Sequence, residues 1–532
     1  MASVGESLIA LLEAYDVEKV FGIPGVHTAE LYRGLATSKI QHITPRHEQG
    51  AGFMADGYAR VTGQPGVCFV ITGPGLSNIA TPMLQARADS IPMLVISGIN
   101  AVGNFGSGRG CLHEMPDQRE FAKSVAVSSH TVLTPNELPE VLARAFAIFD
   151  GARPGPVHIE IPLDLMEQTM TEMPTAIRYP KLWRPRPTSE SVKRAADACR
   201  AARAPVIIVG GGAAGGQEHA VALAERLDAP LVATINGRQL LPFGHPLAVP
   251  ASTSLEAVQT LINDADVVLA FGTEFGPTDN DIYERGSTIK PKTLIRCDID
   301  PEQLCRSHSS DIPLLGDAMA SMQELVSRLG QEPNQGNGAE RASQTSKAAF
   351  SELSETYQSY VGILNTIQEA APGAIIVGDS TQLIYAGNLY FAPNEGAVWF
   401  NSSVGYGTLG YALPAALGAK LGQREKTVIA IAGDGGFQFT MNELGTIADL
   451  AVPIIIVVWN NDGYGEIKSY MLDKDVDPVG VDLTAPDFAL IAQAYGLVGM
   501  RLSDADKLQD AIAQACDRDV ATLIQIDAGR QD

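Results

Sequence analysis

Two polar stretches in the last third of the chain each follow an apolar run typical of a buried strand, at 428–432 and 454–459. The first stretch places Asp434 among glycines, and the second contains Asn461, with 24 residues between the Gly-Asp-Gly and Asn-Asn motifs. Mg²⁺ prefers octahedral oxygen ligands and usually takes one or two carboxylates together with phosphate oxygens. Glycines at the carboxyl end of a strand let backbone amides face a diphosphate. The pair therefore predicts a Mg²⁺-diphosphate clamp, although a lone Gly-Asp-Gly would be an ordinary strand-end turn.

A metal held this way keeps positions for two phosphate oxygens and water. The predicted metal ligands are Asp434, Asn461 and the backbone carbonyl of Gly463. The residues predicted to contact the cofactor here are Gly433, Asp434, Gly435, Gly436, Asn461, Gly463 and Tyr464.

Glu48 is a second candidate for chemistry, because it begins an Ala- and Gly-rich stretch typical of a helix that a ligand can approach closely. If the diphosphate belongs to thiamine diphosphate, a carboxylic acid hydrogen-bonded to the aminopyrimidine ring would let the 4′-amino group act as a base. Alternatively, Glu48 is a surface residue at a helix N-terminus, where the helix dipole favours negative charge. The surrounding residues alone leave both interpretations open.

These residues need strands and helices to position them. A chain of 532 residues is too long for one core, and short β-branched runs alternate with helical patterns in each third, which is typical of parallel sheets. We predict an α/β fold of three tandem doubly wound parallel-sheet domains, at 1–170, at 190–330 (middle Rossmann-like) and at 350–532, which carries the diphosphate-binding clamp. The expected linkers are 179–187 and 331–338. The predicted strands are 67–72, 93–97, 157–161, 205–209, 231–234, 267–271, 293–298, 375–377, 427–432, 454–459 and 523–526.

Three consecutive glycines, Gly210 to Gly212, follow the predicted strand at 205–209. Such a turn before a helix is a common anion site and would suit a nucleotide. The same glycines often only shape a strand-to-helix turn, so we do not expect FAD or another nucleotide in the middle domain.

Charge and composition exclude several classes of protein. A formal net charge of −23 disfavours binding to nucleic acid or to an anionic membrane surface. The chain has no basic, apolar leader at its start and no apolar run of about 20 residues. Its six cysteines form no CxxC pair. We expect a cytoplasmic protein with reduced cysteines that acts on a small molecule.

The motif pair around Asp434 and Asn461 resembles that of thiamine diphosphate enzymes. The segments 21–25, 46–51 and 72–78 resemble successive motifs of the acetolactate synthase and pyruvate decarboxylase family. This resemblance implies that residues 1–170 form a pyrimidine-binding domain, in which Glu48 activates the pyrimidine ring of a cofactor held by another subunit. It therefore implies a homodimer at minimum, and we expect a homotetramer.

The segment 402–410 is similar to the family's stretch that bends the cofactor. By this resemblance, the carbonyl of Gly407 accepts a hydrogen bond from the 4′-amino group. Leu409 is the apolar side chain that lies between the cofactor's two rings.

Two positions depart from well-known members of the family. Simple pyruvate decarboxylases have an aspartate where this chain has Val26, and a His-His pair where it has His113 and Glu114. Acetolactate synthases usually have Gln-Glu at the latter position. The combination of 21–28, 112–118 and 460–468 is most similar to enzymes that convert 5-guanidino-2-oxopentanoate to 4-guanidinobutanal and CO₂ in arginine catabolism. A substrate guanidinium prefers a carboxylate partner.

We therefore predict a carboxy-lyase in which a histidine protonates the intermediate left after CO₂ departs. The predicted catalytic residues are Glu48, His113, His27 and Glu466, and the predicted substrate contacts are Val26, His113, Glu114 and Glu466, with Asp117 as a further acid of the same loops. Each acid could instead be an ordinary solvated side chain. The alternatives are a carboligase such as an acetolactate synthase, a flavin-dependent oxidase, and a non-catalytic subunit, which Glu48 and the clamp argue against.

Overall fold

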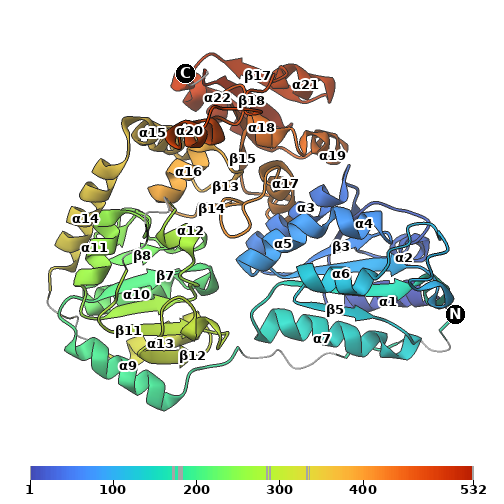
Figure 1. Cartoon of the computed structure of the whole chain (residues 1–532), viewed down its shortest axis with the longest axis horizontal. Helices are drawn as coiled ribbons and strands as arrows, with labels where there is room; N and C mark the ends of the chain where they lie inside the picture. Colours follow the sequence, from blue (N-terminus) through green and yellow to red (C-terminus); the bar gives the residue numbers. More distant parts are fainter. Residues whose placement is uncertain are drawn as a thin grey trace.

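Parallel strands with helices on both faces make up each third of the chain in a computed structural model (Figure 1). The structure describes residues 2–170, 174–177, 184–282, 286, 289–330, 334 and 336–529. Much of the predicted linker at 179–187, and part of that at 331–338, lies outside these residues. The described residues form three six-stranded, all-parallel sheets, which confirms the predicted fold class.

The first sheet has the order β2-β1-β3-β4-β6-β5, and helices from residues 4 to 166 accompany it. Its strands are β1 (Lys19–Gly22), β2 (Gln41–Ile43), β3 (Gly66–Val70), β4 (Met93–Ile99), β5 (Ser128–Thr131) and β6 (Pro156–Pro162). The helices are α1 (Val4–Ala14), α2 (Ala29–Leu35), α3 (Glu48–Thr62), α4 (Pro74–Asn78), α5 (Ala80–Asp89), α6 (Gln118–Val125), α7 (Leu138–Gly151) and α8 (Leu163–Met166).

The second sheet has the order β12-β11-β10-β7-β8-β9. Its strands are β7 (Val206–Val209), β8 (Leu231–Ala233), β9 (Ala248–Val249), β10 (Val268–Phe271), β11 (Leu294–Asp298) and β12 (Ile312–Leu315). The helices are α9 (Ser189–Ala201), α10 (Gln217–Leu227), α11 (Glu256–Asp264), α12 (Pro277–Asn280) and α13 (Ala318–Arg328).

The third sheet, in the order β14-β13-β15-β16-β18-β17, carries the predicted clamp. Its strands are β13 (Ile375–Gly378), β14 (Val398–Asn401), β15 (Val428–Gly433), β16 (Ile455–Asn460), β17 (Val498–Leu502) and β18 (Thr522–Asp527). The helices are α14 (Gly338–Glu352), α15 (Glu355–Ala370), α16 (Gln382–Leu389), α17 (Ala412–Gly422), α18 (Asp434–Phe437), α19 (Leu444–Leu450), α20 (Gly465–Asp473), α21 (Phe488–Ala494) and α22 (Leu508–Cys516).

The predicted strands are interior strands of these sheets, and the missed ones are the six edge strands together with β1. A strand covered on both faces reads as a continuous apolar run, whereas an edge strand can be short and partly polar. The edge strand β12 illustrates this, because its residues alternate between buried and exposed.

Close packing of α3 against α17 joins the first domain to the third (Figure 1). A Cβ atom on Gly57 would lie 2.0 Å from the carbonyl oxygen of Ala415. A Cβ atom on Gly418 would lie 1.9 Å from the carbonyl oxygen of Met54. Glycine at both positions therefore lets the two backbones touch, and this contact holds the helix that begins at Glu48.

A helix that spans a membrane needs about 20 mostly apolar residues. In the described part of the chain, no helix is both long and apolar enough to do so.

Gly57→Ala tests the helix contact. Because the added methyl group overlaps the backbone of α17, we expect it to destabilise the fold by about 1–3 kcal/mol and to lower the urea midpoint of unfolding. The matched control is Gly362→Ala, in α15, where a Cβ would meet nothing within 4 Å. This change should stabilise by about 0.5–1 kcal/mol. A midpoint for Gly57→Ala at or above that of the unmodified chain would contradict the interpretation.

Candidate cofactor site

The two predicted clamp motifs follow adjacent strands. β15 pairs with β16 in parallel, with Gly433 opposite Trp459, so both motifs emerge from the same edge of the sheet. Asp434 is the first residue of α18 and is buried. Asn461 directly follows β16. Strand order alone therefore brings together residues that are 27 positions apart in the sequence.

Three oxygen atoms converge between these strand ends. The side-chain oxygen of Asn461 lies 2.8 Å from the carbonyl oxygen of Gly463 and 3.0 Å from Oδ1 of Asp434. All three are acceptors in this orientation of the amide, in which its nitrogen faces Gln382. With the amide turned over, its N–H would instead donate to Gly463 and Asp434. Such a group of oxygens is what a hard cation requires.

Oδ1 of Asp434 accepts a hydrogen bond from the backbone N–H of Asn461 at 3.5 Å, whereas Oδ2 has no hydrogen-bond partner among the described residues. Burial raises the pKa of Asp434 to about 6. A buried carboxylate is costly unless it is paired or bound to metal. The donor set therefore fits a divalent cation, and its single carboxylate leaves positions for phosphate oxygens.

Gln382 fixes the orientation of the Asn461 amide. Its Oε1 accepts hydrogen bonds from Asn461 Nδ2 at 3.2 Å, Trp459 Nε1 at 3.3 Å and Tyr360 Oη at 3.4 Å. Because the amide nitrogen of Asn461 faces Gln382, its oxygen faces Asp434. Sequence reasoning missed Gln382, although it lies four residues after β13, a predicted strand that ends at the same edge of the sheet.

Asp379, which follows β13, is a second residue that sequence reasoning missed. It is buried, and burial raises its pKa to about 6. Its carboxylate accepts hydrogen bonds from the N–H groups of Ser380 at 2.8 Å and Ala412 at 3.3 Å. The second bond secures the end of the segment that carries Gly407 and Leu409.

The glycines of the clamp lie against side chains of the predicted cofactor site. A Cβ atom on Gly435 would lie 2.7 Å from the ring of Tyr464, and one on Gly436 would lie 3.4 Å from Leu409. Leu409 is thus next to the clamp, as its predicted position between the two rings of the cofactor requires. A Cβ atom on Gly407 would meet nothing within 4 Å, so its backbone borders open space.

Glu48 begins α3, as predicted, with His47 as its N-cap. The side chain is 9% exposed, and Oε2 accepts a hydrogen bond from Asn78 Nδ2 at 2.9 Å. This contact joins two of the motifs recognised in the sequence. The backbone N–H groups of Arg46 and His47 donate to Glu443 of the third domain, at 3.0 and 3.1 Å. Within the described residues, no hydrogen bond joins Glu48 to the clamp of its own chain.

The two predicted histidines meet although 85 residues separate them in the sequence. The rings of His27 and His113 lie edge to face, with centroids 5.1 Å apart. Burial lowers the pKa of His27, and the nearby His113 lowers it further. His113 has a φ of 61°, and its carbonyl oxygen would lie 2.4 Å from a Cβ on Gly73. The histidine loop therefore packs directly on the turn that precedes α4.

The predicted acids differ in the contacts they already have. Glu114 accepts hydrogen bonds from the N–H groups of Gly108 and Gly110 within its own loop, at 2.7 and 2.9 Å. These bonds, of which that from Gly108 is the strongest influence, lower its pKa. Asp117 is the N-cap of α6 and accepts from the N–H of Glu120. Both acids therefore shape the loop.

Glu466 lies in the first turn of α20, close to the clamp. Its Oε1 accepts a hydrogen bond from Tyr357 Oη at 2.9 Å. On the other half of the site, Val26 is 73% exposed beside the buried His27.

The glycine turn of the middle domain is explained by packing. A Cβ atom on Gly210 would lie 2.2 Å from the carbonyl oxygen of Gly272. A Cβ atom on Gly212 would lie 2.9 Å from the Cα of Gly272. The turn borders a cavity of about 1360 Å³ between the first and middle domains. None of the predicted clamp residues lines this cavity.

Comparison with known proteins identifies the class to which this site belongs. The chain matches the N-terminal TPP binding domain of thiamine pyrophosphate enzymes at residues 2–121, their central domain at 192–325 and their C-terminal TPP binding domain at 379–526. The chain belongs to the thiamine pyrophosphate enzyme family.

Individual relatives cover nearly the whole chain. A probable 2-ketoarginine decarboxylase, AruI, from Pseudomonas aeruginosa is 44% identical over 98% of this chain and 94% of its own length. An acetolactate synthase from Mycobacterium leprae is 32% identical over 96% of this chain and 84% of its own. The acetolactate synthase isozyme 3 large subunit of Escherichia coli is 31% identical, over 97% and 93%.

Proposed function

We propose that this enzyme decarboxylates 5-guanidino-2-oxopentanoate, or 2-ketoarginine, to 4-guanidinobutanal and CO₂. The 44% identity to a protein named as a probable 2-ketoarginine decarboxylase supports this substrate. The single structural observation that carries it is Glu466, a carboxylate beside the clamp with one hydrogen-bonded oxygen.

Glu466 is the acid best suited to the guanidinium. Both carboxylate oxygens of Glu114 accept hydrogen bonds from backbone N–H groups of its own loop, and Asp117 caps α6 through the N–H of Glu120. In Glu466, Tyr357 Oη donates to Oε1, and among the described residues no hydrogen bond to Oε2 is present. Oε2 can therefore bind a ligand. A guanidinium bound to a carboxylate gains charge-assisted hydrogen bonds that a neutral side chain cannot supply.

The clamp would hold Mg²⁺ through Asp434 Oδ1, the Asn461 side-chain oxygen and the carbonyl of Gly463, with the diphosphate completing the coordination. Thiamine diphosphate, when bound, supplies an electron sink for the bond that breaks as CO₂ leaves. Glu48 would hold a proton next to the pyrimidine ring. His113 would donate a proton to the product carbon, while the buried His27 stays neutral and fixes its ring.

A homodimer would complete the site, because the resemblance to thiamine diphosphate enzymes implies that Glu48 of one subunit serves the clamp of another. Large apolar side chains are exposed at both halves, including Val26 and Leu112 on the first domain and Ile467 and Tyr470 on α20. No residue of α20 is buried in the single described chain. Exposed apolar surface of this kind is typical of a subunit interface. We propose that the first domain of one subunit covers α20 of the other.

A panel of 2-oxo acids tests the substrate. We expect CO₂ and 4-guanidinobutanal from the guanidino acid, and slow turnover of uncharged acids of similar length. Glu466→Gln should raise KM for the guanidino acid at least about tenfold, because a charged hydrogen bond contributes about 1.5–3 kcal/mol. It should change KM for 2-oxohexanoate little, and Asp473→Asn on the same helix is the control. Acetolactate from pyruvate, with no reaction of the guanidino acid, would replace the proposal by a carboligase.

Gln382→Leu tests the metal clamp. Without Gln382 the Asn461 amide can rotate, so we expect the affinity for Mg²⁺ in the presence of thiamine diphosphate to fall about 10–100-fold. Calorimetric titration with the metal measures this, and a large excess of Mg²⁺ should restore cofactor binding. An unchanged metal affinity would mean that Asn461 is oriented without Gln382.

His113→Ala tests the proton donor. Turnover should fall by about 10²–10⁴-fold, the usual contribution of general acid catalysis, while the Kd for thiamine diphosphate stays the same. The control is His130→Ala, since His130 pairs with Glu137 in the same domain. Unchanged turnover would remove His113 from the reaction.

A further inference from the structure

The segment that carries Gly407 and Leu409 is a glycine-rich loop that follows β14. Gly405, Gly407 and Gly410 all have positive φ angles, of 59°, 70° and 80°. Glycines in such a loop lose much conformational entropy when they are ordered. The loop therefore needs external contacts to hold one conformation.

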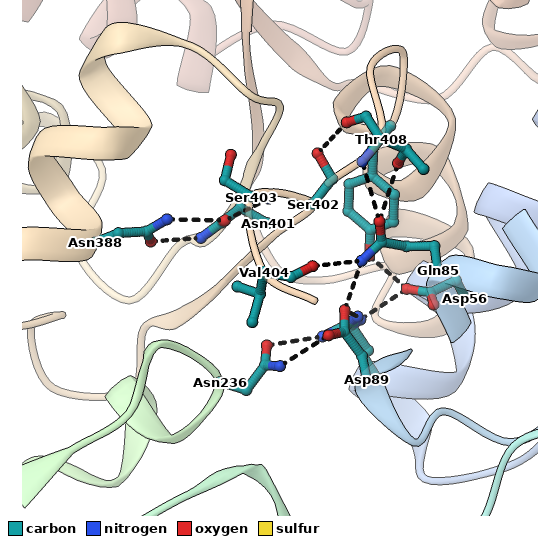
Figure 2. Close-up of polar contacts among 12 residues, drawn as sticks. Asp56, Gln85, Asp89, Asn236, Asn388, Asn401, Ser402, Ser403, Val404 and Thr408 are labelled. Carbon is teal, nitrogen blue, oxygen red and sulfur yellow. Dashed lines mark hydrogen bonds and ion pairs between the residues drawn. The ribbon is translucent and has the colours of Figure 1, made fainter. Parts of the chain in front are cut away.

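Contacts within the third domain hold the start of this loop, as Figure 2 shows. The side-chain amides of Asn388 and Asn401 pair reciprocally, at 2.8 and 3.2 Å. Ser403 N–H donates to Asn401 Oδ1 at 3.0 Å, and Ser402 Oγ donates to the carbonyl of Thr408 at 2.6 Å.

A further anchor comes from outside the third domain, and it is Gln85, in α5 of the first domain (Figure 2). Its Oε1 accepts hydrogen bonds from Thr408 N at 3.3 Å and Thr408 Oγ1 at 3.1 Å. Its Nε2 donates to the carbonyl of Val404 at 3.3 Å. One buried amide thus binds both buried ends of the turn 404–408, whose middle residues 405–407 are exposed. Among the described residues, no other side chain from outside the third domain hydrogen bonds to this turn.

The orientation of the Gln85 amide is itself fixed. Nε2 also donates to Asp89 Oδ2 at 2.8 Å. The same carboxylate is held by Arg60 of α3 and by Asn236 of the middle domain. Because a carboxylate accepts and an amide oxygen cannot donate, the nitrogen of Gln85 must face Asp89. Its oxygen must then face Thr408.

We propose that Gln85 is a positioning residue for the pyrimidine half of the cofactor: it holds the turn 404–408 so that Gly407 and Leu409 reach their places. The proposal rests on the proposed role of this segment in binding thiamine diphosphate. It also gives the first domain two roles. Through Glu48 this domain serves the cofactor of the partner subunit, and through Gln85 it shapes the site of its own chain.

The role can be separated from that of the clamp, because Gln85 contacts none of the metal or diphosphate residues. Gln85→Met keeps the length of the side chain and removes its hydrogen bonds. We expect the Kd for thiamine diphosphate, measured by calorimetry with Mg²⁺, to rise about tenfold. The Kd for inorganic pyrophosphate with Mg²⁺ should not change. Gln303→Met, at another buried glutamine, is the control and should alter neither value.

Thr408→Val is the second variant, and it decides the question if Gln85→Met does not fold. It removes one hydrogen bond to Gln85 and keeps the backbone N–H, so the Kd for thiamine diphosphate should rise about threefold. The Kd for pyrophosphate should again be constant. The proposal is overturned if both ligands weaken equally, or if only the melting temperature falls. Absence of thiamine diphosphate binding by the unmodified chain would instead refute the proposed function on which this inference rests.

Discussion

The cofactor site depends on a buried carboxylate that, among the described residues, pairs with no basic side chain. Asp434 is 1% exposed, and its Oδ1 lies 3.0 Å from the side-chain oxygen of Asn461, which is 2.8 Å from the carbonyl oxygen of Gly463. Acceptors at these distances repel one another, and the repulsion is stronger in a medium of low polarity. Turning the Asn461 amide over would replace the repulsion by hydrogen bonds, but it would also place the amide oxygen against Oε1 of Gln382. Adjacent parallel strands and Gln382 therefore hold the site in the orientation that a cation requires.

The second requirement is that a separate domain approach this point from the other side. Small residues make the approach possible, since Gly57 and Gly418 let α3 and α17 touch backbone to backbone. The same helix begins at Glu48, and the turn before it hydrogen bonds to Glu443 of the third domain. The position of Glu48 is therefore set by the packing of one chain, even though its proposed target lies in another.

The elements that could be predicted from the sequence are those that a few consecutive residues determine. Interior strands such as β15 and β16 are continuous apolar runs, and the ligands that follow them are polar residues at strand ends. Edge strands lack that pattern, because one side of each meets solvent or a loop. Glu48 and His113 were found through motifs, and the structure adds that Asn78 and His27 lie next to them.

Residues that position others were missed for a different reason. Gln382 and Gln85 are single polar residues within helices, and nothing in their neighbours marks them as buried. Their roles appear only when three chain segments meet, which is a property of tertiary packing. Asp379 could have been predicted more easily than these glutamines, because it directly follows β13, a strand that the sequence reveals. Ligands bind at the carboxyl ends of such strands, so its position marks it as a candidate.

The unpartnered oxygen of Asp434 also bears on the lifetime of the enzyme. A ligand that binds only the folded chain stabilises it in proportion to the logarithm of its concentration, and here the metal would give the buried carboxylate a positive partner. We infer that Mg²⁺ and the cofactor would stabilise the folded chain as well as serve its reaction, so the empty form would be the first to unfold on heating.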